Sequence, residues 1–236
     1  MEATGYVTLT RQSGLMREMQ VVANNIANSA TTGFRREGVV FSEFVRRAGD
    51  APSLSMALGE TRRVDLGEGG LVQTGGRFDF AIRGEGFFLL QTDAGERLTR
   101  AGAFTPGPDG SLMTAQGHRL LDGGGAPVVL PPGARQVMLG RDGTLTADGQ
   151  PVARIGLWLP ADPLTLRHEA GTVFSATQTV PVENGKFVQG ALEESNVDPV
   201  AEIARMIEVQ RAYEMGQGFL DREDERVRGM IRTIGG

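Results

Sequence analysis

The stretch that decides the fold is Asp198–Ile234, with the sequence DPVAEIARMIEVQRAYEMGQGFLDREDERVRGMIRTI. Asp198 followed by Pro199 predicts a helix start, because the Asp carboxylate accepts orphan backbone N–H groups and proline fits the first helical position. Apolar side chains then recur every three or four residues, and the seam that we expect to pack consists of Met206, Val209, Tyr213, Leu220 and Val227. A helix of about 35 residues is about 50 Å long, so this seam needs a partner helix.

The N-terminal segment is the available partner. Its seam, at 4-3-4 spacing, predicts a helix over residues 6–28 and consists of Leu15, Met19, Val22 and Ile26. The polar run from Asn24 to Gly33 is expected to end this helix, because Asn and Gly tolerate the positive φ of a helix terminus. Residues 1–47 carry a formal charge of +2 and residues 190–236 carry −4, so pairing is electrostatically permitted.

The middle of the chain has a different composition. Residues 48–189 hold 24 of the 34 glycines and ten of the 11 prolines, which predicts a β-rich region with many tight turns. Phe87-Phe88-Leu89-Leu90 leads to a turn at Asp93-Ala94-Gly95, as in a hairpin. Asp109-Gly110-Ser111-Leu112 recurs as Asp142-Gly143-Thr144-Leu145, which predicts two similar turn-and-strand segments.

These patterns together predict an α+β fold. The N- and C-terminal helices would pair as a discontinuous coiled-coil-like layer, and a hairpin-rich, all-β domain would be inserted between them. The predicted parts are an N-terminal helical segment, a glycine-rich connection, a β-rich middle domain and a C-terminal helical segment, at residues 1–45, 46–76, 77–189 and 190–236.

The composition excludes several kinds of chemistry. With no cysteine, the chain has no disulfide, thiolate nucleophile or iron–sulfur ligand, and its two histidines, His118 and His168, offer little for metal binding or acid–base catalysis. A net charge of −5 argues against nucleic acid as the main partner. The sequence contains no apolar run of membrane-spanning length and no N-terminal signal-peptide pattern, so we expect no membrane insertion.

Three weak motifs have plainer structural explanations. Gly84-Glu85-Gly86 lacks the third glycine and the helix of a dinucleotide site. Gly185-Lys186 is followed by Phe187 and is more typical of a turn before a strand. The charged run Asp221–Arg226 spreads around a helix axis, as in a solvated helix face. We therefore expect no catalytic residue, no metal site and no cofactor.

Three blocks of sequence carry a resemblance. The first lies within Arg11–Arg36 and includes Asn24, Asn25, Asn28, Gly33 and Phe34. The second lies within residues 73–112 and includes Gly84, Gly86 and Phe87. The third lies within residues 190–214 and includes Ser195, Asn196, Asp198, Gln210 and Tyr213. In these motifs and their order the chain resembles the bacterial flagellar rod and hook proteins.

The resemblance implies a structural protein of motility and no enzyme. The chain would be a subunit of the basal-body rod, most like those of its proximal part, that self-assembles through terminal helices into a hollow, torque-transmitting shaft. Its implied partners are other rod subunits, neighbouring basal-body proteins and the flagellar type III export apparatus. The implied location is the periplasm-spanning rod, reached from the cytoplasm without a cleaved signal peptide.

Other functions remain open at this point. The chain could be a distal-rod or hook subunit of the same family. A second class is a β-rich binding module whose terminal helices pair only within the monomer and whose loops at 123–135 or 160–180 hold a soluble or cell-wall ligand. A third is an enzyme that acts on the cell wall, for which the sequence offers no acid pair.

Overall fold

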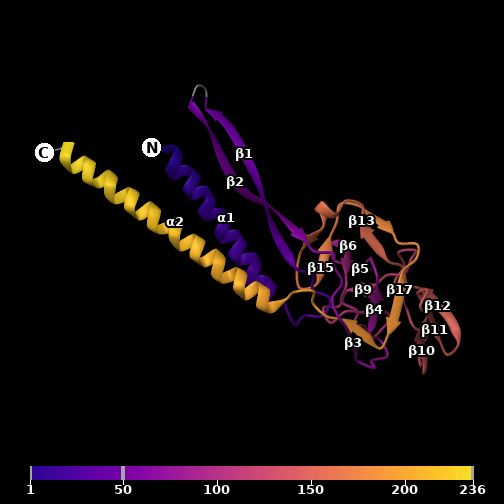
Figure 1. Cartoon of the computed structure of the whole chain (residues 1–236). Coiled ribbons are helices and arrows are strands. Elements are labelled where there is room, and N and C mark those ends of the chain that lie inside the picture. Colours follow the sequence, from indigo (N-terminus) through magenta and orange to yellow (C-terminus); the bar gives the residue numbers. More distant parts are fainter. Residues whose placement is uncertain (1, 49–50, 235–236) are drawn as a thin grey trace. The chain divides into compact units, whose positions relative to one another are not determined.

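A computed structural model describes residues 2–48 and 51–234 of the chain (Figure 1). The chain divides into two compact units. Unit 1 is drawn from Met1–Ala27, Glu37–Arg63 and Asp198–Gly236, and unit 2 from Asn28–Arg36 and Val64–Val197. Terminal helices and a β-rich middle are both present, so the predicted α+β class is confirmed.

Unit 1 contains two helices and a two-stranded ribbon. The helices are α1 (Glu2–Ala27) and α2 (Pro199–Ile234), which run side by side, and the ribbon consists of β1 (Glu37–Ala48) and β2 (Ala51–Val64) (Figure 1). The carboxylate of Asp198 accepts hydrogen bonds from the N–H groups of Val200 and Ala201 at 2.9 and 3.1 Å. The predicted start of the C-terminal helix is thus confirmed, with the expected cap.

The ribbon differs from the expected glycine-rich connection at residues 46–76. Strand β2 occupies residues 51–64 of this segment and contains a single glycine, Gly59. The other glycines that suggested a connection are Gly49, Gly67, Gly69, Gly70, Gly75 and Gly76; Gly49 lies outside the described residues, and the rest follow β2. The average glycine content of residues 46–76 did not reveal the strand within that segment.

Unit 2 is built of short antiparallel strands. Its largest sheet has the order β14-β15-β6-β5-β9-β8-β7, a second has the order β10-β11-β12, and three pairs are β13-β16, β17-β4 and β18-β3. The strands of the seven-stranded sheet, in chain order, are β5 (Phe88–Thr92), β6 (Gly95–Thr99), β7 (Thr105–Pro106), β8 (Leu112–Met113), β9 (Arg119–Leu120), β14 (Arg167–His168) and β15 (Val173–Ser175). The remaining elements are β3 (Leu71–Gln73), β4 (Phe80–Arg83), β10 (Val137–Leu139), β11 (Thr144–Ala147), β12 (Gln150–Arg154), β13 (Trp158–Pro160), the 3₁₀ turn η1 (Pro163–Thr165), β16 (Thr179–Pro181), β17 (Lys186–Gln189) and β18 (Ala191–Glu193).

Strand β5 separates two apolar clusters. Successive side chains of a strand point to opposite faces, so Phe88 and Leu90 enter one cluster while Phe87 and Leu89 enter the other. The larger cluster also takes Phe80 and Ile82 from β4 and Phe187 from β17. The run Phe87–Leu90 is therefore continuously apolar because the strand is covered on both faces. The predicted hairpin turn at Asp93-Ala94-Gly95 is confirmed by the pairing of Thr92 with Gly95.

The repeated sequence forms two equivalent turns. In each copy the Asp carboxylate accepts hydrogen bonds from the backbone N–H and the hydroxyl two residues later, from Ser111 to Asp109 and from Thr144 to Asp142. In each copy the following leucine, Leu112 or Leu145, is fully buried. The predicted similarity is confirmed: each turn fixes one core leucine.

Neither α1 nor α2, over the part of the chain that the structure describes, combines the length and the apolar character that crossing a bilayer requires.

Candidate functional site: a helix pair and a buried ionic junction

Three polar contacts set the direction and register of the two helices of unit 1. The amide of Gln12 donates to the carbonyl of Tyr213 at 2.9 Å, and the guanidinium of Arg205 contacts Glu18 at 2.5 Å. The amide of Asn25 donates to the carboxylate of Glu202 at 3.1 Å. As residue numbers rise along α1 they fall along α2, so the helices are antiparallel. The two numbers in each pair add up to between 223 and 227, so the register stays within about one helical turn along the pair.

The residues of the two predicted seams differ in burial along this pair. Val22 and Val209 are buried, with 3% and 1% of their surface exposed. Six further seam residues are half-buried: Leu15, Met19, Ile26, Met206, Tyr213 and Leu220. Val227 is exposed. In the observed register Val227 lies beyond the start of α1 at Glu2, so α1 offers it no opposite residue.

Gly216 interrupts the seam for a steric reason. A Cβ atom at this position would overlap the side-chain amide of Gln12, so the absence of a side chain makes room for Gln12. The Oε1 atom of Gln12 is buried and accepts no hydrogen bond from the described residues. A buried polar group of this kind fixes the register of a helix pair more than it stabilises the pair.

Asn25 joins α1 to the ribbon within unit 1. Its side chain is fully buried, its Oδ1 accepts the N–H of Glu37 at 3.0 Å and its Nδ2 donates to the carbonyl of Glu37 at 2.8 Å. Burial raises the pKa of Glu37, and the positive charge of Arg62 opposes this increase. Of the neighbouring motif positions, Asn24 is exposed and so is Gln210 on α2.

Unit 2 holds the chain segment that follows α1 through Gly33 and Phe34. Gly33 has a φ of +73° and donates its N–H to the carbonyl of Glu193 at 2.7 Å. The ring of Phe34 is fully buried, with its centroid 5.1 Å from that of His168. His168 also contacts Phe174 at 4.8 Å, so this histidine belongs to an aromatic cluster.

A methyl group at Gly33 is expected to destabilise unit 2 by about 1–3 kcal/mol or more, because it adds a strained backbone conformation to an overlap with the backbone of Ala101. Gly33→Ala can be measured by urea unfolding followed through the fluorescence of Trp158, which is the one tryptophan of the chain and lies in unit 2. Gly75→Ala is the matched control, since Gly75 has a φ of +69° and open space around it. Equal losses for the two variants would contradict the steric argument.

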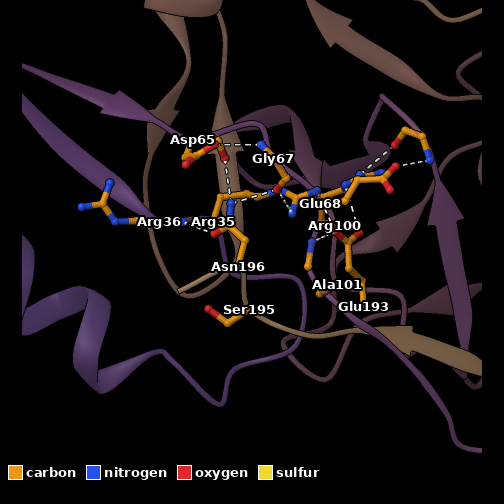
Figure 2. Close-up of polar contacts among 12 residues, drawn as sticks. Arg35, Arg36, Asp65, Gly67, Glu68, Arg100, Ala101, Glu193, Ser195 and Asn196 are labelled. Atoms are coloured by element: carbon orange, nitrogen blue, oxygen red, sulfur yellow. Dashed lines mark hydrogen bonds and ion pairs between the residues drawn. The ribbon is translucent and has the colours of Figure 1, made fainter. Parts of the chain in front are cut away.

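A buried ionic junction lies beside this segment (Figure 2). Arg35 Nη2 lies 2.7 Å from Glu193 Oε1, and Arg100 Nε lies 3.1 Å from Glu193 Oε2. Each of the three side chains is only 1% exposed. One carboxylate thus holds two buried guanidinium groups that come from distant parts of the sequence.

Backbone groups complete the junction. Arg35 Nη1 donates to the carbonyl of Gly67 at 2.6 Å, and Arg100 Nη2 donates to that of Gly84 at 2.8 Å. The N–H of Gly69 donates to Glu193 Oε1 at 2.9 Å. The guanidinium carbon of Arg100 also lies 5.8 Å from the centroid of the Phe87 ring.

The junction contains more positive than negative charge. Burial lowers the pKa of Arg35, and burial together with the charge of Arg35 lowers the pKa of Arg100 to about 10. Glu193 opposes both decreases, and so does Glu68, an exposed residue that accepts the N–H of Gly84. Removing Glu193 would leave two buried cations without their nearest anion.

Asn196 continues the same network (Figure 2). Its Oδ1 accepts the N–H of Arg36 at 2.6 Å, and its Nδ2 donates to the carbonyls of Asp65 and Gly67 at 3.3 and 2.9 Å. Next to it, the hydroxyl of Ser195 accepts the N–H of Val197 at 3.3 Å.

Most of the remaining motif positions have a structural role in unit 2. Gly84 supplies the carbonyl that holds Arg100, Gly86 lies against the side chain of Leu157, and Phe87 is buried beneath Arg100. The carbonyl and side-chain oxygen of Asn28 accept hydrogen bonds from Thr31 in the turn after α1.

Sequence reasoning did not single out Arg35, Arg100 or Glu193 as site residues. Each is a charge beside glycine or apolar motif residues: Arg35 follows Phe34, Arg100 precedes Ala101-Gly102, and Glu193 follows Leu192. A charged residue next to such motif residues is a signal that could have identified these three as buried site residues. Among the described residues no group of three or more His, Asp or Glu side chains is placed to hold a metal ion.

Comparisons with known proteins point in one direction. Three family models match the chain: "Flagella basal body rod protein" over residues 6–35, "Flagellar hook protein FlgE/F/G D1 domain" over residues 81–147, and "Flagellar basal body rod FlgEFG protein C-terminal" over residues 188–232. The chain is 40% identical to the flagellar basal-body rod protein FlgF of Caulobacter vibrioides, over 98% of this chain and 97% of that one.

Two further relatives have comparable lengths. The FlgF protein of Mesorhizobium japonicum is 38% identical, over 100% of this chain and 99% of its own. The flagellar basal-body rod protein FlgG of Agrobacterium fabrum is 32% identical, over 93% of this chain and 94% of its own.

Proposed function

The chain belongs to the family of flagellar basal-body rod proteins, and on that basis we propose that it is a structural subunit of the proximal rod, built into the shaft through its terminal helices. The FlgF proteins of Caulobacter vibrioides and Mesorhizobium japonicum match it at higher identity than the FlgG protein of Agrobacterium fabrum does, which favours the proximal over the distal rod. Its role is mechanical: the subunit transmits torque and contributes to a hollow path through the basal body. It performs this role without catalysis or a cofactor.

The observation that carries the proposal is the pair α1–α2. The two seams are only partly covered by their partner helix, and large apolar side chains remain exposed on both helices: Leu9, Met16, Ile203, Ile207, Met215, Phe219, Val227 and Met230. Exposed apolar side chains in such number are typical of an association surface. A neighbouring subunit's helices would cover them, and a repeated contact that does not close on itself generates a helical array.

Export through the flagellum's own type III apparatus accompanies this proposal. A chain without disulfides can enter a narrow channel unfolded, and the assembled subunit would lie in the part of the basal body that crosses the periplasm. Its partners there would be other rod subunits and neighbouring basal-body proteins.

A chain that ends at Val197 tests the proposal, because it removes α2 and leaves the residues of unit 2 complete. We expect the truncated protein to be absent from purified basal bodies and a strain that depends on it to be non-motile, while the urea transition reported by Trp158 stays unchanged. As control, a chain that ends at Gly190 also lacks Glu193 and Asn196 and should lose that transition. A self-contained binding module would behave differently, since loss of α2 would unfold it.

A further inference from the structure

Unit 2 carries an open groove that the family motifs do not account for. It has a volume of about 1300 Å³ and is lined by the end of β4, the turn before β11, the end of β12, the start of β13 and the turn before β17. Its apolar residues include Ile155, Leu157 and Phe187, which belong to the core. The groove is larger than the roughly 300–1000 Å³ of a small-molecule pocket.

Three cations in the groove have no anion of their own. Arg83, Arg141 and Lys186 are exposed and form no hydrogen bond or ion pair through their side chains with the described residues. Lys186 is the single lysine of the chain. A fourth cation, Arg154, lies close enough to Asp142 to help lower the pKa of that carboxyl, which the hydrogen bonds from Thr144 lower more strongly.

Two of these cations face each other across a strand pair. In the antiparallel pairing of β4 with β17, Arg83 lies directly opposite Lys186, and the neighbouring pair of Ile82 and Phe187 points into the core. Like charges at opposite positions destabilise a strand pair. Arg141 lies beside this pair, because its carbonyl accepts the N–H of Phe187, the residue after Lys186, at 3.2 Å.

Among the described residues, the acids of the groove form no ion pair with this cluster. Asp122 accepts hydrogen bonds from the N–H groups of Gly124 and Ala126, and Asp142 accepts them from the N–H group and the hydroxyl of Thr144. The third lining acid, Glu183, accepts no such hydrogen bond from the described residues. With Arg154 the lining holds four cations against these three acids, a small excess of positive charge on a chain whose net charge is −5.

We propose that this groove binds an acidic peptide segment of a neighbouring basal-body protein, whose carboxylates pair with Arg83, Arg141 and Lys186. Arginine guanidinium groups bind carboxylates with two parallel hydrogen bonds, so an extended segment with Asp or Glu side chains fits their chemistry. The choice of partner rests on the proposed rod function, whereas binding of acidic peptide does not depend on it.

A peptide fits the groove better than a nucleic acid or a glycan. The net charge of −5 argues against a long polyphosphate backbone as the ligand, whereas a short acidic peptide needs only the few cations that the groove supplies. Trp158 is the one aromatic besides Phe187 in the lining, and its indole nitrogen is buried next to the position of Gly156. A sugar would therefore find little exposed aromatic face on which to stack.

The test uses the purified full-length chain and a fluorescent hexaglutamate peptide, followed by anisotropy at about 50 mM salt, where exposed charges are weakly screened. We expect saturable binding that Arg83→Gln combined with Lys186→Gln weakens by about tenfold or more. Arg77→Gln combined with Arg135→Gln removes the same charge from exposed arginines outside the groove and should change binding by less than about twofold. Hexalysine should not bind.

Several results would overturn the inference. Equal weakening by the two double variants would show a general charge effect, and displacement of hexaglutamate by chitotetraose would assign the groove to a glycan. In cells, the groove variant should lower motility and the control variant should not, and normal motility of the groove variant would exclude a basal-body partner. The anisotropy measurement needs no assembled rod. A failure of peptide binding can therefore be distinguished from a failure of incorporation into the rod.

Discussion

Replacing Glu193 with glutamine is expected to destabilise unit 2 by about 3–5 kcal/mol, the usual cost of leaving buried charges unpaired. Glutamine has the same shape as glutamate but no charge, so Arg35 and Arg100 would face each other in a buried site without their nearest anion. A loss of this size is a large part of the roughly 5–15 kcal/mol by which a domain is stable. Urea unfolding followed through Trp158 measures it.

Glu194→Gln is the matched control, because it removes the same charge from the adjacent, exposed position. We expect this variant to stay within about 0.5 kcal/mol of the unchanged chain. Adding Arg100→Met to Glu193→Gln should restore part of the lost stability, since one of the two unpaired cations is gone. If Glu193→Gln were as stable as the control, the junction would have no structural importance.

An aspartate at Val209 is expected to separate α1 from α2 and to abolish motility. Val209 is 1% exposed in the helix pair, and a buried carboxylate without a partner costs several kcal/mol. Circular dichroism of the purified chain should show a loss of helix, while the urea transition of unit 2 stays unchanged because Val209 belongs to unit 1. The variant should also be missing from purified basal bodies.

Two further variants on α2 separate pairing within the chain from assembly between chains. Met215 is 69% exposed, so Met215→Asp should leave the helix content intact and still prevent incorporation into the rod. Gln217→Asp adds the same charge at an exposed polar position and should affect neither. Motility of the Val209→Asp strain would refute the role of the seam, and motility of the Met215→Asp strain would refute the role of the exposed face.

The sequence was informative where local chemistry decides the structure. The Asp198-Pro199 helix start and the positive φ of Gly33 follow from side-chain chemistry and backbone preference, and both are present. Of the predicted seam on α2, Val209 is buried. The resemblance to rod proteins rested on motif residues, of which Gly33, Gly84 and Asn196 lie in or beside the ionic junction.

Two features could not be predicted, for different reasons. The ribbon β1–β2 was missed because the glycines of residues 46–76 mostly follow it, so an average composition described the wrong part of the segment. The junction was missed because Arg35, Arg100 and Glu193 are far apart in the chain, and one sequence carries no record of which distant charges pair. Charged side chains are also expected at the surface, and burial of these three depends on tertiary contacts.

The long separations within the junction also bear on the order of events in folding. Asn196 binds the N–H of Arg36 across 160 residues, and Glu193 binds the N–H of Gly69 across 124. Closing such long loops costs chain entropy before any contact forms, and domains dominated by distant contacts fold slowly. A ribosome must therefore release almost the whole chain before unit 2 can close, which prolongs the unfolded interval after synthesis.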